Sequence, residues 1–469
     1  MSTNTPTTAT TTSTTAPYDE LRAVLTGTVH TPDDPAYATL SSPWLLTEPM
    51  RPAAVVAVRT AEDVAETVRF ARRHGCTVGV QATGHGAVSS LAGHLLVVTA
   101  GLDELTVHPQ GWARVGAGVK WKPVIEAAAP FGLAPLNGST SDVGVVGYTT
   151  GGGVGPLART HGLAADRVRA FDVVTGDGEL RRVTPEEHPD LFRALRGGKG
   201  ASAIVTAVEF DMVHLPTFYG GAVYFDAHDA ATVISRWRTW SQELPEQGTT
   251  SFALFQLPDM PGVPPALAGR MTLAVRFAWT GDAQEGRRLL DQLRATGPVV
   301  LDDATLRPYT EVDAVHADPV DPMPVVDPAI LLDGFPEEAI DTLLAVAGPD
   351  SGSPQLLVEL RHLGGAYARP AAHPDAFCHR DAAYSLLAVG FPEMGAAEHA
   401  EQIFAAMAAW DNGMIWPNFG PAHDERTARR AYDEETLAHL AEVVRTYDPD
   451  GVLQIGGFTR QVDGDAAAA

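Results

Sequence analysis

The chain has 469 residues, of which 45% are hydrophobic and 19% charged, so it can bury cores for two or three domains or lobes. The formal net charge of -25 repels nucleic acids and anionic membrane surfaces and favours a small molecule as the partner. Cys76 and Cys378 form neither a metal-binding pattern nor a disulfide framework, and no other spacing predicts a metal site.

Residues 1–17 are mostly threonine, with serine, alanine and proline, and this composition has too little apolar surface to fold. We therefore expect a disordered tail. It has no basic region followed by an apolar run, as a secretory signal would, and no later segment is long and apolar enough to span a membrane. We expect a cytoplasmic protein on these grounds.

Strands and helices alternate after the tail. Thr60 and Asp63 form a capping-box pattern at the start of a helix, and Gly75 is expected to end it. Asp177-Gly178 is expected to form the turn of a hairpin. Strands are predicted at 52–58, 77–81, 95–99, 167–174, 179–183 and 203–211, and helices at 61–74, 122–130 and 189–195. This succession is typical of an α/β or α+β nucleotide-binding lobe, which ends near Pro216.

The middle third has a different pattern. Helices are predicted at 230–243, 283–295, 336–347 and 396–410, and strands at 251–257, 271–280, 355–362 and 383–390. We expect a sheet with helices on one face and the other face free to cover a ligand. Alternation along the strand at 355–362 places Gln355, Glu359 and Arg361 on one side, which should face something polar. A last helix is predicted at 434–446.

The residues from Gly138 to Gly155 include seven glycines and no lysine or arginine. Each glycine adds backbone entropy to the cost of folding, so this stretch is not expected to form an ordinary helix or strand. Its bare backbone indicates a phosphate or pyrophosphate held by peptide N–H groups, and therefore a dinucleotide. The spacing differs from Gly-x-Gly-x-x-Gly at a strand-to-helix junction, which argues against a Rossmann NAD fold.

Two stretches resemble a known family. Residues 51–216, with Thr83-Gly84-His85-Gly86 and the glycine-rich stretch, resemble the flavin-binding domain of the vanillyl-alcohol-oxidase superfamily. Residues 416–453 resemble the closing segment of its berberine-bridge-enzyme-like branch. The resemblance implies an α+β fold with a two-lobed FAD-binding domain of the PCMH type over 18–215. A substrate-binding domain over 216–410 follows, with an antiparallel sheet backed by helices, and a segment over 411–469 returns to the FAD-binding domain.

In that family FAD lies between the two lobes, and a histidine can bond covalently to the 8α-methyl group of the flavin. The matching residue is His85. Many relatives form a second bond through a cysteine, whose position is Thr140 here, so the resemblance implies a single histidyl linkage or tight non-covalent FAD. Val143 matches a position where valine accompanies access of dioxygen to the flavin. The residues that the resemblance places at the cofactor are Ala82, Thr83, Gly84, His85, Gly86, Thr140, Val143, Gly144, Gly147, Tyr148, Gly151, Gly152, Gly153, Gly198, Ile204 and Asn418.

Five residues are candidates for the chemistry. Tyr148 is the first candidate for the group that removes the substrate proton, and stacking or hydrogen bonding beside the flavin is its alternative role. Trp416 replaces a tyrosine that assists deprotonation in many relatives, and it is either a wall of the flavin cavity or a packing residue between the lobes. Asn418 orients the flavin or the substrate by its amide. Glu359 and Arg361 either face the site or form an ion pair with each other. Ala201-Ser202-Ala203 also replaces the usual Asn-Phe-Gly.

The resemblance implies an FAD-dependent oxidase that takes a hydride from a small alcohol, amine or activated C–H compound to flavin N5. A natural-product intermediate is among the possible substrates. Dioxygen then reoxidises the cofactor and yields hydrogen peroxide. The alternatives are a dehydrogenase that uses another electron acceptor and a catalytically silent flavin-binding protein, which the loss of the tyrosine at position 416 makes conceivable.

Overall fold

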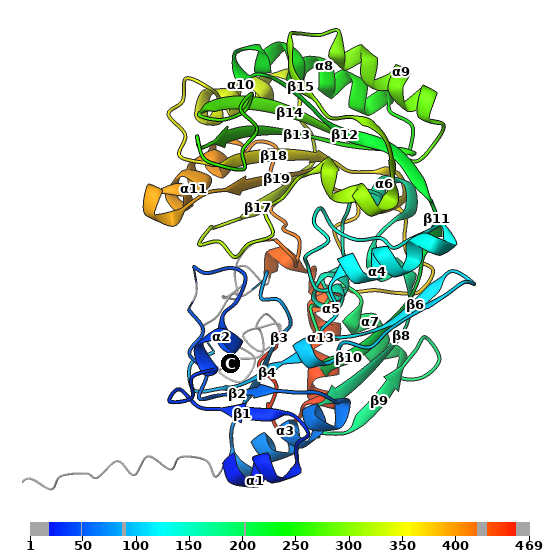
Figure 1. Ribbon diagram of the computed structural model, residues 1–469, viewed down its shortest axis with the longest axis vertical. Helices are drawn as coiled ribbons and strands as arrows, with labels where there is room; N and C mark the ends of the chain where they lie inside the picture. The colour runs from blue at the N-terminus through cyan, green and yellow to red at the C-terminus, as the bar shows by residue number, and fades with distance from the viewer. Residues whose placement is uncertain (1–17, 48, 87–90, 201–202, 420–428, 456–469) are drawn as a thin grey trace, which may run out of the picture.

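The computed structural model describes residues 18–47, 49–86, 91–200, 203–419 and 429–455, and it has an α+β fold of two stacked lobes (Figure 1). The expected tail at 1–17 lies outside the described residues, as do Ala201, Ser202 and parts of the closing segment. Among the described residues, the first lobe contains a four-stranded, a five-stranded and a two-stranded sheet, and the second lobe contains one large sheet. No helix among the described residues is long and apolar enough to cross a membrane.

The N-terminal sheet has the strand order β1-β2-β4-β3. Residues on alternate sides of its strands pack on different helices, because Val56 and Val97 join the core beside α3 whereas Val55 and Leu96 pack toward α2. Both predicted caps of α3 are present: Thr60 and Asp63 form the capping box, and Gly75 ends the helix in the left-handed conformation. The elements are α1 (Tyr18–Val24), β1 (Thr28–His30), α2 (Tyr37–Ser41), β2 (Ala54–Ala57), α3 (Ala61–His74), β3 (Val78–Gln81) and β4 (Leu95–Val98).

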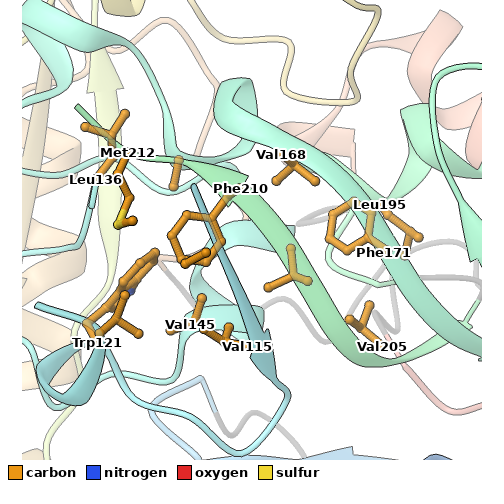
Figure 2. Packing of buried hydrophobic residues seen from close by; sticks show 14 of the residues in the cluster. Val115, Trp121, Leu136, Val145, Val168, Phe171, Leu195, Val205, Phe210 and Met212 are labelled. Atoms are coloured by element: carbon orange, nitrogen blue, oxygen red, sulfur yellow. The ribbon is translucent and has the colours of Figure 1, made fainter. Parts of the chain in front are cut away.

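The second sheet is antiparallel, with the strand order β5-β6-β10-β8-β9. Its core is shown in Figure 2, where Trp121 and Phe210 meet edge to face at 5.4 Å beside Val145 and Val115. The elements around it are β5 (Leu105–His108), β6 (Trp112–Gly116), α4 (Trp121–Ala128), β7 (Leu133–Ala134), β8 (Val168–Thr175), β9 (Leu180–Val183), α7 (Pro189–Leu195), β10 (Ala203–Asp211) and β11 (Val213–His214). The strands β5, β6, β7 and β11 were not predicted.

The glycine-rich stretch contains a short helix, α5 (Val145–Thr150), and is followed by α6 (Ala158–His161). The prediction that the stretch forms no helix was therefore wrong for six of its residues. The reason is tertiary packing, because Val145 is fully buried in the core of this lobe and stabilises a turn that isolated propensities disfavour.

The second lobe has an eight-stranded antiparallel sheet with the strand order β15-β12-β14-β13-β18-β19-β17, and β16 also pairs with β12. Helices α8, α9 and α10 cover the face that points away from the first lobe (Figure 1). The alternation predicted for the strand at 355–362 is present, because Val358 and Leu360 pack toward the helices and Arg361 faces the cavity described below.

The predicted bounds in this lobe are close to the observed ones, except that the helix expected at 396–410 ends at Ala406. Strands β12, β15, β16 and β17 were not predicted. The elements are β12 (Thr217–Asp226), α8 (Ala230–Glu243), β13 (Gly248–Leu257), β14 (Arg270–Trp279), α9 (Ala283–Arg294), β15 (Val299–Asp302), β16 (Thr305–Pro308), β17 (Ala329–Leu332), α10 (Glu337–Ala347), β18 (Leu357–His362), β19 (Tyr384–Val389) and α11 (Ala396–Ala406).

The last described helix, α13 (Glu434–Tyr447), packs on α7 and so returns the chain to the first lobe (Figure 1). Leu440 of α13 lies in the same core as Phe192 of α7. The residues after α13 also join the first lobe, because Val78 at the start of β3 donates its N–H to the carbonyl of Val452 at 2.8 Å.

Candidate active site

A cavity of about 2310 Å³ lies between the lobes. It is much larger than the roughly 300–1,000 Å³ of an ordinary small-molecule site, so it has room for a dinucleotide together with a substrate. The loop Ala82–Gly86 and the residues from Gly138 to Tyr148 line one side. Residues of the large sheet and the segment 314–330 of the second lobe line the other side.

His85 lies in the wall of this cavity. Its ring stacks on Trp44 with 4.4 Å between the ring centroids, and its Nδ1 is 3.0 Å from Thr83 Oγ1. The other ring nitrogen, Nε2, is buried and has no hydrogen-bond partner in the described part of the chain. Burial lowers the pKa of His85 to about 4, so the imidazole is neutral at neutral pH. A neutral ring with an unpaired nitrogen is the chemical form that can be attached to an electrophilic carbon.

The backbone around His85 requires glycine. Gly84 has φ +76°, and a Cβ there would lie 2.6 Å from Pro43. Trp44 is fixed in turn, because its indole N–H donates to the carbonyl of Val320 and its backbone N–H donates to that of Thr83. The sequence predicted the histidine but missed Trp44, which lies in an irregular segment far from any motif.

The glycine-rich stretch is pinned by the second lobe. Asp313 accepts hydrogen bonds from the backbone N–H of Ser141 at 2.8 Å and from its hydroxyl group. Thr140, Val143, Gly144 and Gly147 line the cavity from this stretch, together with Ser139. Of the predicted cofactor residues, those that line the cavity are Ala82, Thr83, Gly84, His85, Gly86, Thr140, Val143, Gly144, Gly147, Tyr148 and Asn418.

Five predicted cofactor residues are absent from the lining that the described residues form: Gly151, Gly152, Gly153, Gly198 and Ile204. The glycines among them leave room for other segments of the protein, and Ile204 packs in a hydrophobic core. A Cβ on Gly151 would overlap Asn418, one on Gly152 would overlap Phe377, and one on Gly198 would overlap the carbonyl of Ala194. Ile204 is fully buried in the core of the N-terminal sheet. The close approach that these glycines allow is therefore between protein segments.

Tyr148 lines the cavity, but its hydroxyl group is directed into the protein. The hydroxyl oxygen is buried without a hydrogen-bond partner among the described residues, and a Cβ on Gly155 would lie 2.9 Å from it. Burial raises the pKa of Tyr148 far above that of a free tyrosine, so the phenolate is disfavoured. This geometry argues against Tyr148 as the proton acceptor and favours the alternative role beside the cofactor.

Asn418 and Lys199 meet where the closing segment reaches the first lobe. Lys199 Nζ donates to Asn418 Oδ1 at 2.5 Å, and Asn418 Nδ2 donates to the carbonyl of Tyr148 at 2.9 Å. Both residues line the cavity. Lys199 was missed, although a single lysine among the glycines of 197–200 is unusual in a chain with three lysines.

Arg361 faces the cavity, whereas Glu359 lies beneath it. Glu359 is fully buried and accepts hydrogen bonds from Arg361 Nε at 2.8 Å, Arg276 Nη1 at 2.6 Å and Ser251 Oγ at 2.7 Å. It does not line the cavity, and the two arginines hold its pKa well below the usual range. The ion-pair alternative therefore holds, and Glu359 is not placed to touch a substrate. Arg361 also lies over the ring of Phe419 at 5.5 Å.

Trp416 is not part of the cavity wall that the described residues form. It is 2% exposed, packs with Tyr367 and Phe377, and donates its indole N–H to the hydroxyl of Tyr367 at 3.0 Å. Phe419, its neighbour at 5.8 Å, lines the cavity in its place. Trp416 thus packs between other side chains of the protein, which is the second of its two expected roles.

Asp327 is a second ionisable group that the sequence did not single out. It lies just before β17, is half-buried and lines the cavity. Its carboxyl group is paired with no other residue in the described ranges. Burial raises the pKa of Asp327 to about 6, and the charge of Lys199 opposes this shift. No motif surrounds Asp327, so only the three-dimensional structure identifies it.

The chain matches the model of the FAD binding domain family over residues 52–184. It is 28% identical to the (R)-6-hydroxynicotine oxidase of Paenarthrobacter nicotinovorans over 90% of this chain and 94% of that protein. It is 38% identical to the FAD-dependent monooxygenase FUP4 of Fusarium proliferatum, but there the match covers 37% of this chain and 34% of the relative. The chain therefore spans about a third of that fungal protein and nearly all of the bacterial one.

Solved structures of similar proteins agree with these matches. The crystal structure of 6-hydroxy-D-nicotine oxidase from Arthrobacter nicotinovorans superposes with a TM-score of 0.77, at 26% identity, over 91% of this chain and 96% of that one. Physcomitrella patens BBE-like 1 shares the fold, with a TM-score of 0.81 at 18% identity over 95% and 98% of the two chains. The chain accordingly has an FAD-binding domain, is similar over nearly its whole length to an FAD-linked oxidase, and shares its fold with a BBE-like protein.

Proposed function

We propose that this protein is an FAD-linked oxidase that removes a hydride from a small organic substrate and passes the electrons to dioxygen, with release of hydrogen peroxide. The observation that carries the proposal is the cavity between the lobes, which has the neutral, unpaired imidazole of His85 in its wall. FAD, when bound, supplies the two-electron acceptor for the substrate hydride and the group that dioxygen reoxidises.

The residues of the first lobe fit FAD. The loop Ala82–Gly86 and the segment from Thr140 to Tyr148 form a wall with small side chains and open backbone. His85 offers Nε2 for covalent attachment, because Nδ1 is already paired with Thr83. Thr140 has a hydroxyl group where a second, cysteinyl attachment would need a thiol, so we expect a single linkage.

In this proposal the substrate binds against the second lobe. Arg361 presents N–H groups that its pairing with Glu359 leaves free, and Phe419 adds an apolar surface beside it. Such a pair suits an aromatic or heterocyclic compound with an oxygen acceptor. The segment around Trp44 pairs with the segment around Met323, and both segments line one side of the cavity.

Asp327 is the residue best placed to hold the proton that the substrate loses. It faces the cavity, and a pKa of about 6 leaves most of it ionised at neutral pH while keeping it basic enough to accept a proton. Tyr148 is a poorer choice, because its hydroxyl is buried away from the cavity. Val143, the residue expected to control the access of dioxygen, also lines the cavity.

The first test is acid precipitation of the purified protein, followed by mass spectrometry. We expect the yellow colour and a mass increment of one FAD to remain with the polypeptide, and to leave it in a His85→Ala variant. Free FAD in the supernatant would refute the linkage and keep the cofactor assignment. A colourless protein that FAD does not reconstitute would refute the proposed function.

The second test concerns substrate and acceptor. The bacterial relative is named for 6-hydroxynicotine, which is therefore the first compound to screen, followed by aromatic alcohols and cyclic amines, with detection of hydrogen peroxide. Anaerobic bleaching of the flavin by a compound identifies it as a substrate. Turnover with an artificial dye but none in air would favour the dehydrogenase alternative.

A further inference from the structure

Lys199 is an isolated cation on the cavity wall. The chain has three lysines, Lys120, Lys122 and Lys199, and of these Lys199 alone lines the cavity. Lys120 forms an ion pair with Asp142, whereas Lys199 forms none with a carboxylate of the described residues. Burial of a charged group without a counter-charge is unfavourable, so we expect this ammonium group to interact with a molecule that the cavity binds.

The ammonium group lies where three separate segments meet. It donates to Asn418 Oδ1 at 2.5 Å and to the carbonyl of Gly147 at 3.4 Å, and a Cβ on Gly86 would lie 3.7 Å from it. Gly86 belongs to the loop of His85, Gly147 to the glycine-rich stretch and Asn418 to the closing segment. Both of its acceptors are neutral oxygens, so its positive charge is not cancelled there.

The backbone at Lys199 is also unusual. Its φ of +59° lies in the left-handed region, which glycine occupies without strain and lysine does not. The conformation is held from outside, because the N–H groups of Gly197 and Lys199 both donate to the carbonyl of Thr150 at 2.9 Å. A glycine would fit this loop better, which indicates that the lysine side chain serves the site rather than the loop.

The Lys199 ammonium group keeps its positive charge at neutral pH. Burial lowers the pKa of Lys199 to about 8, which still leaves the group mostly protonated at neutral pH. The ionisable group across the cavity that interacts with it is Asp327. Since Asp327 is not within ion-pair distance, the cation remains available to a bound anion.

We propose that the Lys199 ammonium contacts the flavin ring system of bound FAD and stabilises the negative charge that the ring gains on reduction. The inference rests on the proposed function. The substrate transfers a hydride, so the ring gains two electrons and one proton and carries one net negative charge. Lys199 forms no covalent bond and keeps its proton. Preorganised positive charge at the place where negative charge develops is the usual source of such stabilisation.

Sulfite tests this role without knowledge of the substrate, because it adds to the oxidised flavin ring and leaves a negative charge on it. Sulfite is titrated into FAD-loaded wild-type protein and into Lys199→Gln, Lys199→Arg and Lys122→Gln variants, and the midpoint potential is measured for each. Lys122 is exposed on α4 and absent from the cavity wall, so it is the matched control.

We expect Lys199→Gln to weaken sulfite binding by about tenfold or more and to lower the potential, because it removes a charge at contact distance. Lys199→Arg should stay close to wild type, and Lys122→Gln should be unchanged. Wild-type sulfite affinity in a Lys199→Gln variant with full FAD content would overturn the inference. So would a variant that loses FAD while its remaining holoprotein binds sulfite normally, since the lysine would then contact the pyrophosphate. A wild-type protein without FAD would refute the proposed function itself.

Discussion

Asp327 is the residue whose ionisation should govern activity on the acid side. The base must be ionised to accept a proton, so kcat/KM of the wild type should rise with pH through about 6. Asp327→Asn should lose that inflection and slow anaerobic flavin reduction by about 100-fold or more, in line with the usual contribution of a general base. Stopped-flow absorbance at several pH values measures both effects. Asp341→Asn, at an exposed acid on α10 outside the cavity lining that the described residues form, is the control; equal reduction rates in the two variants would exclude Asp327.

The same carboxyl group predicts a dependence of stability on pH. Its pKa is raised above the unfolded value of 3.8, so its favourable contribution is complete below about pH 4 and is lost as pH rises through about 6. Asp327→Asn should therefore raise the melting temperature at pH 7 and change it little at pH 4. Thermal unfolding of both proteins at the two pH values checks this. An equal shift at pH 4 and pH 7 would contradict a raised pKa.

Trp416 should matter for stability rather than for the flavin. Trp416→Phe removes the indole N–H that donates to buried Tyr367 and leaves that hydroxyl with one partner fewer. We expect a loss of about 1–3 kcal/mol in the free energy of unfolding and an unchanged flavin absorption spectrum. Denaturant unfolding and visible spectroscopy measure the two outcomes. A shifted flavin spectrum with unchanged stability would restore the role as a cavity wall.

At the scale of elements, the glycines in and just after helix α5 have two different roles. Gly151 leaves room for a neighbouring segment of the protein, whereas Gly147 lines the cavity. Gly151 follows the helix, and a Cβ there would overlap Asn418, so Gly151→Ala should displace Asn418 and destabilise the apoprotein by about 1–3 kcal/mol. Gly147 has open space around it, and alanine is the better helix former, so Gly147→Ala should leave the apoprotein as stable or up to about 1 kcal/mol more stable.

For Gly147→Ala, the expected effect on FAD binding is opposite to the expected effect on the stability of the apoprotein. Gly147 lines the cavity, so Gly147→Ala should lower the FAD content even though the apoprotein is stable. Comparing flavin content with the melting temperature of the apoprotein separates the two effects. Full flavin content in Gly147→Ala would show that the cofactor does not approach this part of the helix.

These elements also show what the sequence can and cannot predict. Helices α3, α7 and α8 were placed to the residue, because their apolar spacing, and for α3 also its caps, are local signals. Strands β12 and β17 were missed, since their register depends on partners far along the chain. The site followed the same division. His85 was predicted from a motif that the resemblance recognised, whereas Asp327 and Trp44 reach the cavity only through contacts between lobes.

At the scale of the whole molecule, the site exists only while the two lobes stay together, and Arg159 is one of the buried polar contacts that join them. It lies on α6 of the first lobe, is 6% exposed, and donates to the carbonyls of Gly248 at 2.8 Å, Leu244 at 3.1 Å and Leu363. All three carbonyls belong to the second lobe.

Arg159→Met keeps most of the side-chain volume but leaves these buried carbonyls without their donor, at about 1–3 kcal/mol each. We expect the free energy of unfolding to fall by about 3 kcal/mol or more, and limited proteolysis to become faster between the lobes. Arg288→Met, which removes a largely exposed pair with Glu285 on α9, should stay within about 0.5 kcal/mol of wild type. If the two variants unfold alike, the lobes are held by their other contacts, such as the ion pair between Arg380 and Asp166, and Arg159 only fills space. If Arg159→Met unfolds in two separate transitions, the lobes fold independently and the contacts of Arg159 supply the coupling between them.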